Sequence, residues 1–98
     1  MPHEIPPNLE STVSLLKRSY PEGFPDDVLL AVLRLLYAEL SDRNLAFVAS
    51  HITGMEPSVA LNKVYEAAAL DVSDPRVQAA AERLKKHGYD VWLAEVSP

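Results

Sequence analysis

The chain has 98 residues, a formal net charge of −5, no cysteine and 48% hydrophobic residues. Its size predicts one domain, and the absence of cysteine excludes disulfides, thiolate metal sites and a cysteine nucleophile. The longest apolar run, residues 28–33, is far shorter than the roughly 20 residues of a membrane span, and the proline-bearing N-terminus does not resemble a signal peptide. We therefore expect a cytoplasmic protein that does not enter a membrane, and the negative charge disfavours a nucleic-acid partner.

Residues 26–40 form the most apolar stretch of the chain, and we expect the fold to be organised around it. On a helix, its apolar side chains fall on two adjacent stripes, Leu29, Val32, Leu33, Leu36 and Leu40, and Val28, Ala31 and Leu35. Only the line through Leu30, Arg34 and Tyr37 is left for water. A helix that is apolar nearly all round has to be covered by others, so this one is predicted to be central.

Capping residues and apolar spacing predict four further helices, at residues 9–19, 42–52, 57–68 and 74–87. Asn8 and Ser41 are predicted N-caps, Gly54 and Gly88 are predicted helix ends, and Pro57 suits a first turn. No stretch alternates as a strand would. The prediction is an all-α bundle of about five short helices in a single domain, with an irregular N-terminal arm at residues 1–8 and the bundle at residues 9–88. The helices at 9–19, 42–52 and 74–87 are expected to pack on the central one.

Residues 20–25, Tyr-Pro-Glu-Gly-Phe-Pro, carry the densest turn signal in the chain. Pro21 biases Tyr20 away from helix, Gly23 can adopt a positive φ, and Pro25 suits the first turn of the next helix. Tyr20, Pro21, Gly23 and Pro25 are therefore interpreted as structural turn residues. Because the connection is short, the two helices that it joins are predicted to be adjacent and antiparallel.

The order and spacing of these features resemble an actinobacterial family of small proteins filed as domain of unknown function 3349. The resemblance rests on the turn at residues 20–25, the Leu-rich segment 29–36, Leu-Ser-Asp at 40–42, and Arg83-Leu84 followed by Gly88 and an aromatic residue. It covers roughly residues 9–89, and it implies a compact bundle of five helices whose biochemical role is unknown. Many members carry tryptophan directly after the closing glycine, where this chain has Tyr89.

Residues that would carry catalysis or bind a metal are scarce. None of His3, His51 and His87 belongs to a His-x-x-x-His or Glu-x-x-His pair, and no serine lies in a G-x-S-x-G turn. The three glycines are all interpreted as turns or helix ends, so none remains for a phosphate-binding loop. We therefore predict that the protein is not an enzyme and that it has no catalytic residue, no cofactor and no metal site.

Residues 89–98 are too apolar for a free tail and too short to assign as helix or strand. One interpretation is an apolar C-terminal arm that folds back over the bundle and buries Trp92. The other is an exposed arm whose Tyr89, Val91, Trp92 and Leu93 anchor a protein partner, because aromatic residues dominate the centres of interfaces. Tyr37, on the exposed line of the central helix, is the second predicted contact residue.

The function predicted by elimination is a non-enzymatic protein-interaction module with an unidentified protein partner, acting as a monomer or a weak homodimer. The alternative is a helix-turn-helix that binds nucleic acid, made by the helices at residues 42–52 and 57–68. Its second helix would present Asn62 and Lys63, and the helix at 74–87 would contact phosphates through its four basic residues, Arg76, Arg83, Lys85 and Lys86. The net charge of −5 argues against this alternative.

Overall fold

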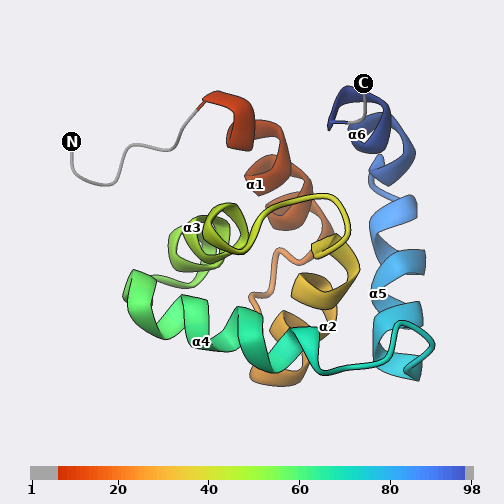
Figure 1. Cartoon of the computed structure of the whole chain (residues 1–98). Helices are drawn as coiled ribbons and strands as arrows, with labels where there is room; N and C mark the ends of the chain where they lie inside the picture. Colours follow the sequence, from red (N-terminus) through yellow and green to blue (C-terminus); the bar gives the residue numbers. More distant parts are fainter. Residues whose placement is uncertain (1–6, 97–98) are drawn as a thin grey trace.

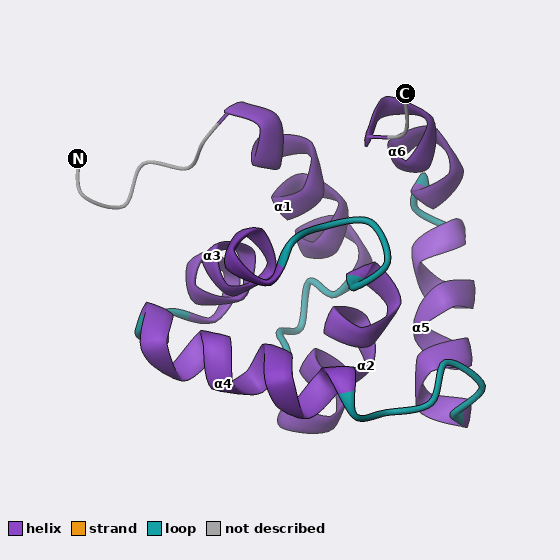
Figure 2. Cartoon of the chain, in the orientation of Figure 1, coloured by secondary structure: helices purple, strands orange, loops and turns teal. Residues whose placement is uncertain are grey.

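The computed structural model describes residues 7–96, and this part of the chain forms six helices and no strand. Figure 1 shows them in chain order: α1 (Pro7–Ser19), α2 (Asp26–Leu36), α3 (Asp42–Thr53), α4 (Pro57–Ala68), α5 (Pro75–Lys85) and α6 (Tyr89–Val96). Short loops join them (Figure 2). The all-α prediction is confirmed, whereas the predicted count of about five is one short, because residues 89–96 form a sixth helix.

The central position of α2 is confirmed, but one of its predicted neighbours is not. α2 packs on α5 and α4 and touches α3, while α1 packs on α3, α5 and α6 (Figure 1). No Cα atom of α1 comes within 8 Å of one in α2, so the predicted antiparallel pair is wrong. Residues 20–23 of the connecting segment form a turn, in which the Gly23 N–H donates to the Tyr20 carbonyl at 3.0 Å. After this turn the chain does not run back along α1.

α2 supplies the largest share of the fully covered apolar side chains, as its pattern predicts. Leu29, Ala31, Val32, Leu33 and Leu36 are buried in it. The helix ends at Leu36 and not at residue 40, because the hydrogen bonds tighten from four-residue to three-residue spacing: the Tyr37 N–H donates to the Arg34 carbonyl and the Glu39 N–H to the Leu36 carbonyl.

Several local signals act as predicted. Ser41 caps α3 by accepting from the Asn44 N–H at 3.2 Å, and Gly54 ends that helix with a φ of 81°. Pro57 is the first residue of α4, whose bounds match the prediction. Asp74, which the prediction places inside the helix, instead caps α5 by accepting from the Arg76 N–H at 2.9 Å.

The remaining differences concern helix ends. α1 begins at Pro7, so Asn8 lies in its first turn and not at the predicted N-cap position, and residues 7 and 8 belong to the helix and not to an arm. Residues 1–6 of the predicted arm lie outside the described residues. α5 begins one residue later and ends two residues earlier than predicted, because Asp74 is its cap and the chain turns at residues 86–88.

Candidate functional site

The C-terminal segment folds back over the bundle, as the first interpretation expects. The side chain of Trp92 is only 3% exposed, and its indole N–H donates to the Thr12 hydroxyl at 2.8 Å. Its ring stacks on that of Tyr89, with 5.7 Å between the centroids. Tyr89 is buried as well, and this burial raises the pKa of its phenol. In this arrangement α6 presents neither aromatic side chain to a partner, and Leu93 is half-buried.

Tyr37, the other predicted contact residue, lies just after α2 and is 37% exposed. The Arg34 guanidinium lies 5.9 Å from the centre of its ring. The Nε of Arg34 also donates to the Leu70 carbonyl at 2.8 Å, which ties α2 to the loop between α4 and α5. Arg34, on the polar line predicted for the central helix, thus helps to hold the loop between α4 and α5 in place.

The turn at residues 20–25 is held by Arg83 from α5. The Nε of Arg83 donates to the Ser19 carbonyl and a terminal nitrogen donates to the Glu22 carboxylate, each at 2.6 Å. The guanidinium carbon lies 4.4 Å from the centre of the Tyr20 ring, which is buried. A backbone N–H and Arg83 together lower the pKa of Glu22, while burial raises the pKa of Tyr20.

The basic residues proposed for the helix-turn-helix are mostly engaged within the molecule. Lys63 pairs with Asp26 at 2.7 Å and with Glu66 at 3.3 Å, and Arg76 pairs with its own cap, Asp74, at 3.0 Å. Arg83 is engaged by the turn. Two of the four predicted phosphate contacts on α5 are therefore occupied by intramolecular partners.

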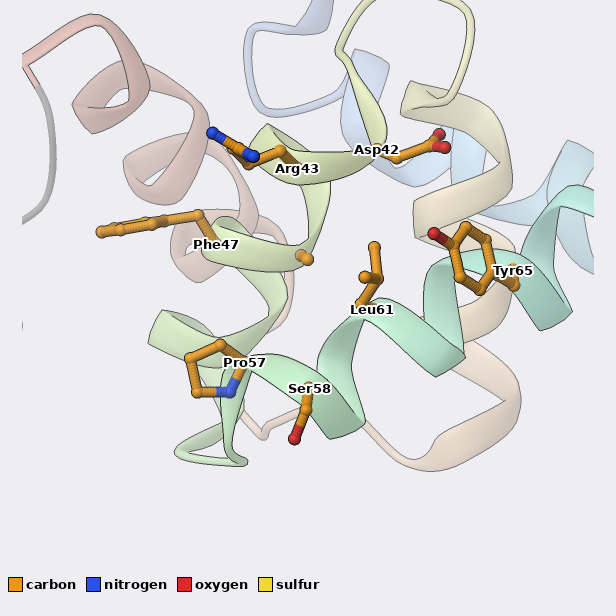
Figure 3. Close-up of a pocket in the computed structure, with 8 residues that line it drawn as sticks. Asp42, Arg43, Phe47, Pro57, Ser58, Leu61 and Tyr65 are labelled. Carbon is orange, nitrogen blue, oxygen red and sulfur yellow. The ribbon is translucent and has the colours of Figure 1, made fainter.

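An apolar groove lies elsewhere, between α3 and α4. These two helices pack on each other more extensively than any other pair in the described part of the chain, yet a groove of about 420 Å³ remains on their outer side. Figure 3 shows its lining, which comes from both helices: Asp42, Arg43, Ala46 and Phe47 from α3, and Pro57, Ser58, Leu61 and Tyr65 from α4. We refer to it below as the α3–α4 groove.

The α3–α4 groove exposes side chains that a helical hairpin ordinarily covers. Tyr65 is 54% exposed, while Phe47 and Leu61 are half-buried against the core. A second hollow, lined by Ser50, His51, Gly54, Met55 and Glu56, shares Phe47 and Pro57 with it. The groove therefore continues past Phe47 to the loop between the two helices.

Sequence reasoning missed this groove, although a signal was present. Phe47 lies off the apolar face that Leu45, Val48, Ala49 and Ile52 form in residues 42–52. Leu61 and Tyr65 lie off the face that Ala60, Val64 and Ala67 form in residues 57–68. Large apolar residues outside the buried stripes of two consecutive helices indicate a second apolar face.

Other kinds of site find no support in residues 7–96. No group of three or more histidine, aspartate or glutamate side chains in this range is placed to hold a metal ion. Every buried side-chain nitrogen or oxygen in the same range has a hydrogen-bond partner. None of the helices in this range combines the length and hydropathy that crossing a membrane requires.

Comparison of the chain with protein-family models, with curated proteins and with solved structures gives no match. The resemblance to the family of domain of unknown function 3349 stays a prediction.

Proposed function

We propose that the protein is a non-enzymatic protein-interaction module and that the α3–α4 groove is its contact surface. The observation that carries the proposal is the exposed ring of Tyr65 beside the half-buried Phe47 and Leu61. Aromatic side chains contribute large contact areas with few rotatable bonds, and they are enriched where interfaces are most strongly stabilised. A concave apolar surface of this kind is stabilised when a partner covers it.

Binding of nucleic acid through α3 and α4 has weaker support. The lysine of α4 is already paired with two carboxylates, and two of the four basic residues of α5 have intramolecular partners. A duplex would also meet a chain with a net charge of −5. We keep the cytoplasm as the proposed location, which suits a chain without cysteine, and a monomer or weak homodimer as the proposed state.

The proposal is tested by affinity purification of the tagged protein from its own cells, with and without nuclease. Tyr65→Ala removes an exposed anchor of the groove, Leu61→Asp places a charge in its wall, and Val91→Asp is the control on α6, where Val91 is 65% exposed. We expect a protein partner that resists nuclease, is retained by Val91→Asp and is lost with both groove variants. Recovery that nuclease abolishes would favour the nucleic-acid alternative, and recovery unaffected by both groove variants would contradict the proposed surface.

A further inference from the structure

Arg43, on the rim of the α3–α4 groove, is the one arginine that the fold does not use. Among residues 7–96, the other four arginines donate to a backbone carbonyl or pair with a carboxylate: Arg18 with His87, Arg34 with Leu70, Arg76 with Asp74, and Arg83 with Ser19 and Glu22. Arg43 is exposed and makes no hydrogen bond, ion pair or ring contact with these residues. Its guanidinium is therefore available to a partner.

The position of Arg43 in its helix does not account for its charge. It is the second residue of α3, and the first turn of a helix carries the positive end of the helix dipole, which disfavours a cation. The basic residues in the last turns of α1 and α5, by contrast, lie at the favourable end. A cation that is unpaired, exposed and unfavourable for its own helix points to a role outside the isolated chain.

The shape of the groove limits how a partner can bind. The described residues contain no strand, so a partner cannot pair its backbone with a sheet edge, and the affinity has to come from side chains. The α4 wall presents Pro57, Leu61 and Tyr65 at four-residue intervals, a span of about 12 Å at the helical rise of about 1.5 Å per residue. Two turns of a partner helix, with apolar side chains at positions i, i+4 and i+7, cover the same length.

Arg43 and Phe47 are one turn apart on α3, and their side chains point the same way (Figure 3). A partner helix that contacts Phe47 therefore passes next to the guanidinium. A guanidinium binds carboxylates with two parallel hydrogen bonds, and within residues 7–96 no carboxylate pairs with Arg43, so a partner can supply the acid.

We propose that the α3–α4 groove binds an amphipathic helical segment of another protein, with apolar side chains at i, i+4 and i+7 and an aspartate or glutamate that pairs with Arg43. This inference rests on the proposed protein-interaction function and adds the chemistry of the partner.

The test is a selection of random 16-residue peptides displayed on phage against the purified full chain. The selected peptides are synthesised, and their dissociation constants are measured by fluorescence anisotropy with the wild type and with four variants. Leu61→Asp and Tyr65→Ala report on the groove. Arg43→Glu reports on the charge, and Lys86→Glu, an equal charge change at an exposed lysine of α5's C-terminal cap, is its matched control.

We expect peptides with helical apolar spacing and a conserved acid, which lose binding with both groove variants. Arg43→Glu should weaken them by about fivefold or more, whereas Lys86→Glu should change affinity by less than about twofold. When the acidic residue of the peptide is replaced with lysine, the peptide should bind the wild type more weakly. The same lysine peptide should bind the Arg43→Glu variant with restored affinity.

The unfavourable outcomes separate the two proposals. Peptides that depend on Leu61 and Tyr65 but are proline-rich, or are indifferent to Arg43→Glu, would overturn the helical acidic partner and leave the proposed function standing. Selected peptides that bind both groove variants as well as they bind the wild type would overturn the groove as a binding surface, and both proposals with it.

Discussion

Arg83 and Arg43 mark two regions of the molecule that are built differently. Around Arg83, groups from α1, α5 and the turn at residues 20–25 satisfy one another: the guanidinium reaches the Ser19 backbone carbonyl, the Glu22 carboxylate and the Tyr20 ring. Around Arg43, the apolar walls of α3 and α4 stay partly open, and the guanidinium has no partner among the described residues.

The side chains around Arg83 stabilise the fold, whereas the exposed side chains of the α3–α4 groove contribute little to it. We call the surroundings of Arg83, together with α6, the closed region; in α6 the Trp92 indole donates to the Thr12 hydroxyl. Removing a side chain from this region should lower the free energy of unfolding. At the exposed positions of the α3–α4 groove, Arg43 and Tyr65, changing the side chain should leave stability nearly unchanged, or raise it, and lower binding.

The largest loss of stability is expected from Leu33→Ala at the centre of α2. Leu33 is fully buried, so the substitution leaves a cavity and should lower the free energy of unfolding by about 2–5 kcal/mol. Urea unfolding followed by circular dichroism measures it. A loss below about 0.5 kcal/mol would mean that α2 is not the core of the fold.

Trp92→Phe tests how much the packing of α6 against α1 contributes to stability. It removes the indole donor and leaves the buried Thr12 hydroxyl without its partner, so we expect a loss of about 1–3 kcal/mol in unfolding free energy. Adding Thr12→Val should recover part of that loss, because the unpaired hydroxyl is then gone. Trp92 is the only tryptophan, and its emission in the wild type should be blue-shifted and resistant to quenchers. Emission typical of water would contradict the closed arrangement.

The Glu22–Arg83 pair predicts a pH dependence of stability. Because its own backbone N–H and the Arg83 guanidinium lower the pKa of Glu22 from its usual 4.5, these contacts stabilise the fold above that pH, and their contribution is lost as the pH falls through the lowered value. The urea midpoint of Glu22→Gln should therefore lie below that of the wild type at pH 7, and the gap should close in acid. In an Arg83→Gln background, the same Glu22→Gln substitution should produce a smaller pH-dependent difference, and the part that remains comes from the backbone N–H. A gap that is the same at all pH values would exclude the ion pair as its cause.

Arg43→Glu is expected to raise stability, in contrast with the substitutions above. Reversing the charge in the first turn of α3 complements the helix dipole and should add about 0.3–1 kcal/mol to the unfolding free energy at low salt. The gain should shrink at high salt because screening weakens it. A loss of stability would show that Arg43 has a structural role in the free chain.

Tyr65→Ala should have the smallest effect on stability. The side chain is 54% exposed, and substitutions at such positions ordinarily change the unfolding free energy by less than about 0.5 kcal/mol. A larger loss, measured in the same urea titration, would mean that Tyr65 supports the hairpin of α3 and α4.

Much of the fold could be predicted because its signals are local. Ser41 and Gly54 act on backbone groups within a few residues of themselves, so their roles could be predicted without knowing the fold. α6 could not be assigned because its eight residues are weakly patterned, and Trp92 is held by Thr12, 80 positions away. The partners of α1 were misjudged because a short connection does not force two helices together.

The groove was harder to predict because no single helix contains it. Phe47 on α3 and the pair Leu61 and Tyr65 on α4 form one surface only after the hairpin closes. The role of Arg43 depends on an absence of partners, which a sequence does not show. Tyr89 and Trp92, chosen as contact residues for their aromatic character, lie instead in the core.

The central claim, that the α3–α4 groove meets a protein partner, is tested most directly by site-specific photo-crosslinking in cells. A benzophenone side chain replaces Tyr65 in one sample and Val91 in another, since the two positions are similarly exposed at 54% and 65%. We expect a discrete protein adduct from position 65 that disappears when Leu61→Asp is added, and none from position 91. An adduct from position 91 alone, or one from position 65 that survives Leu61→Asp, would contradict the claim.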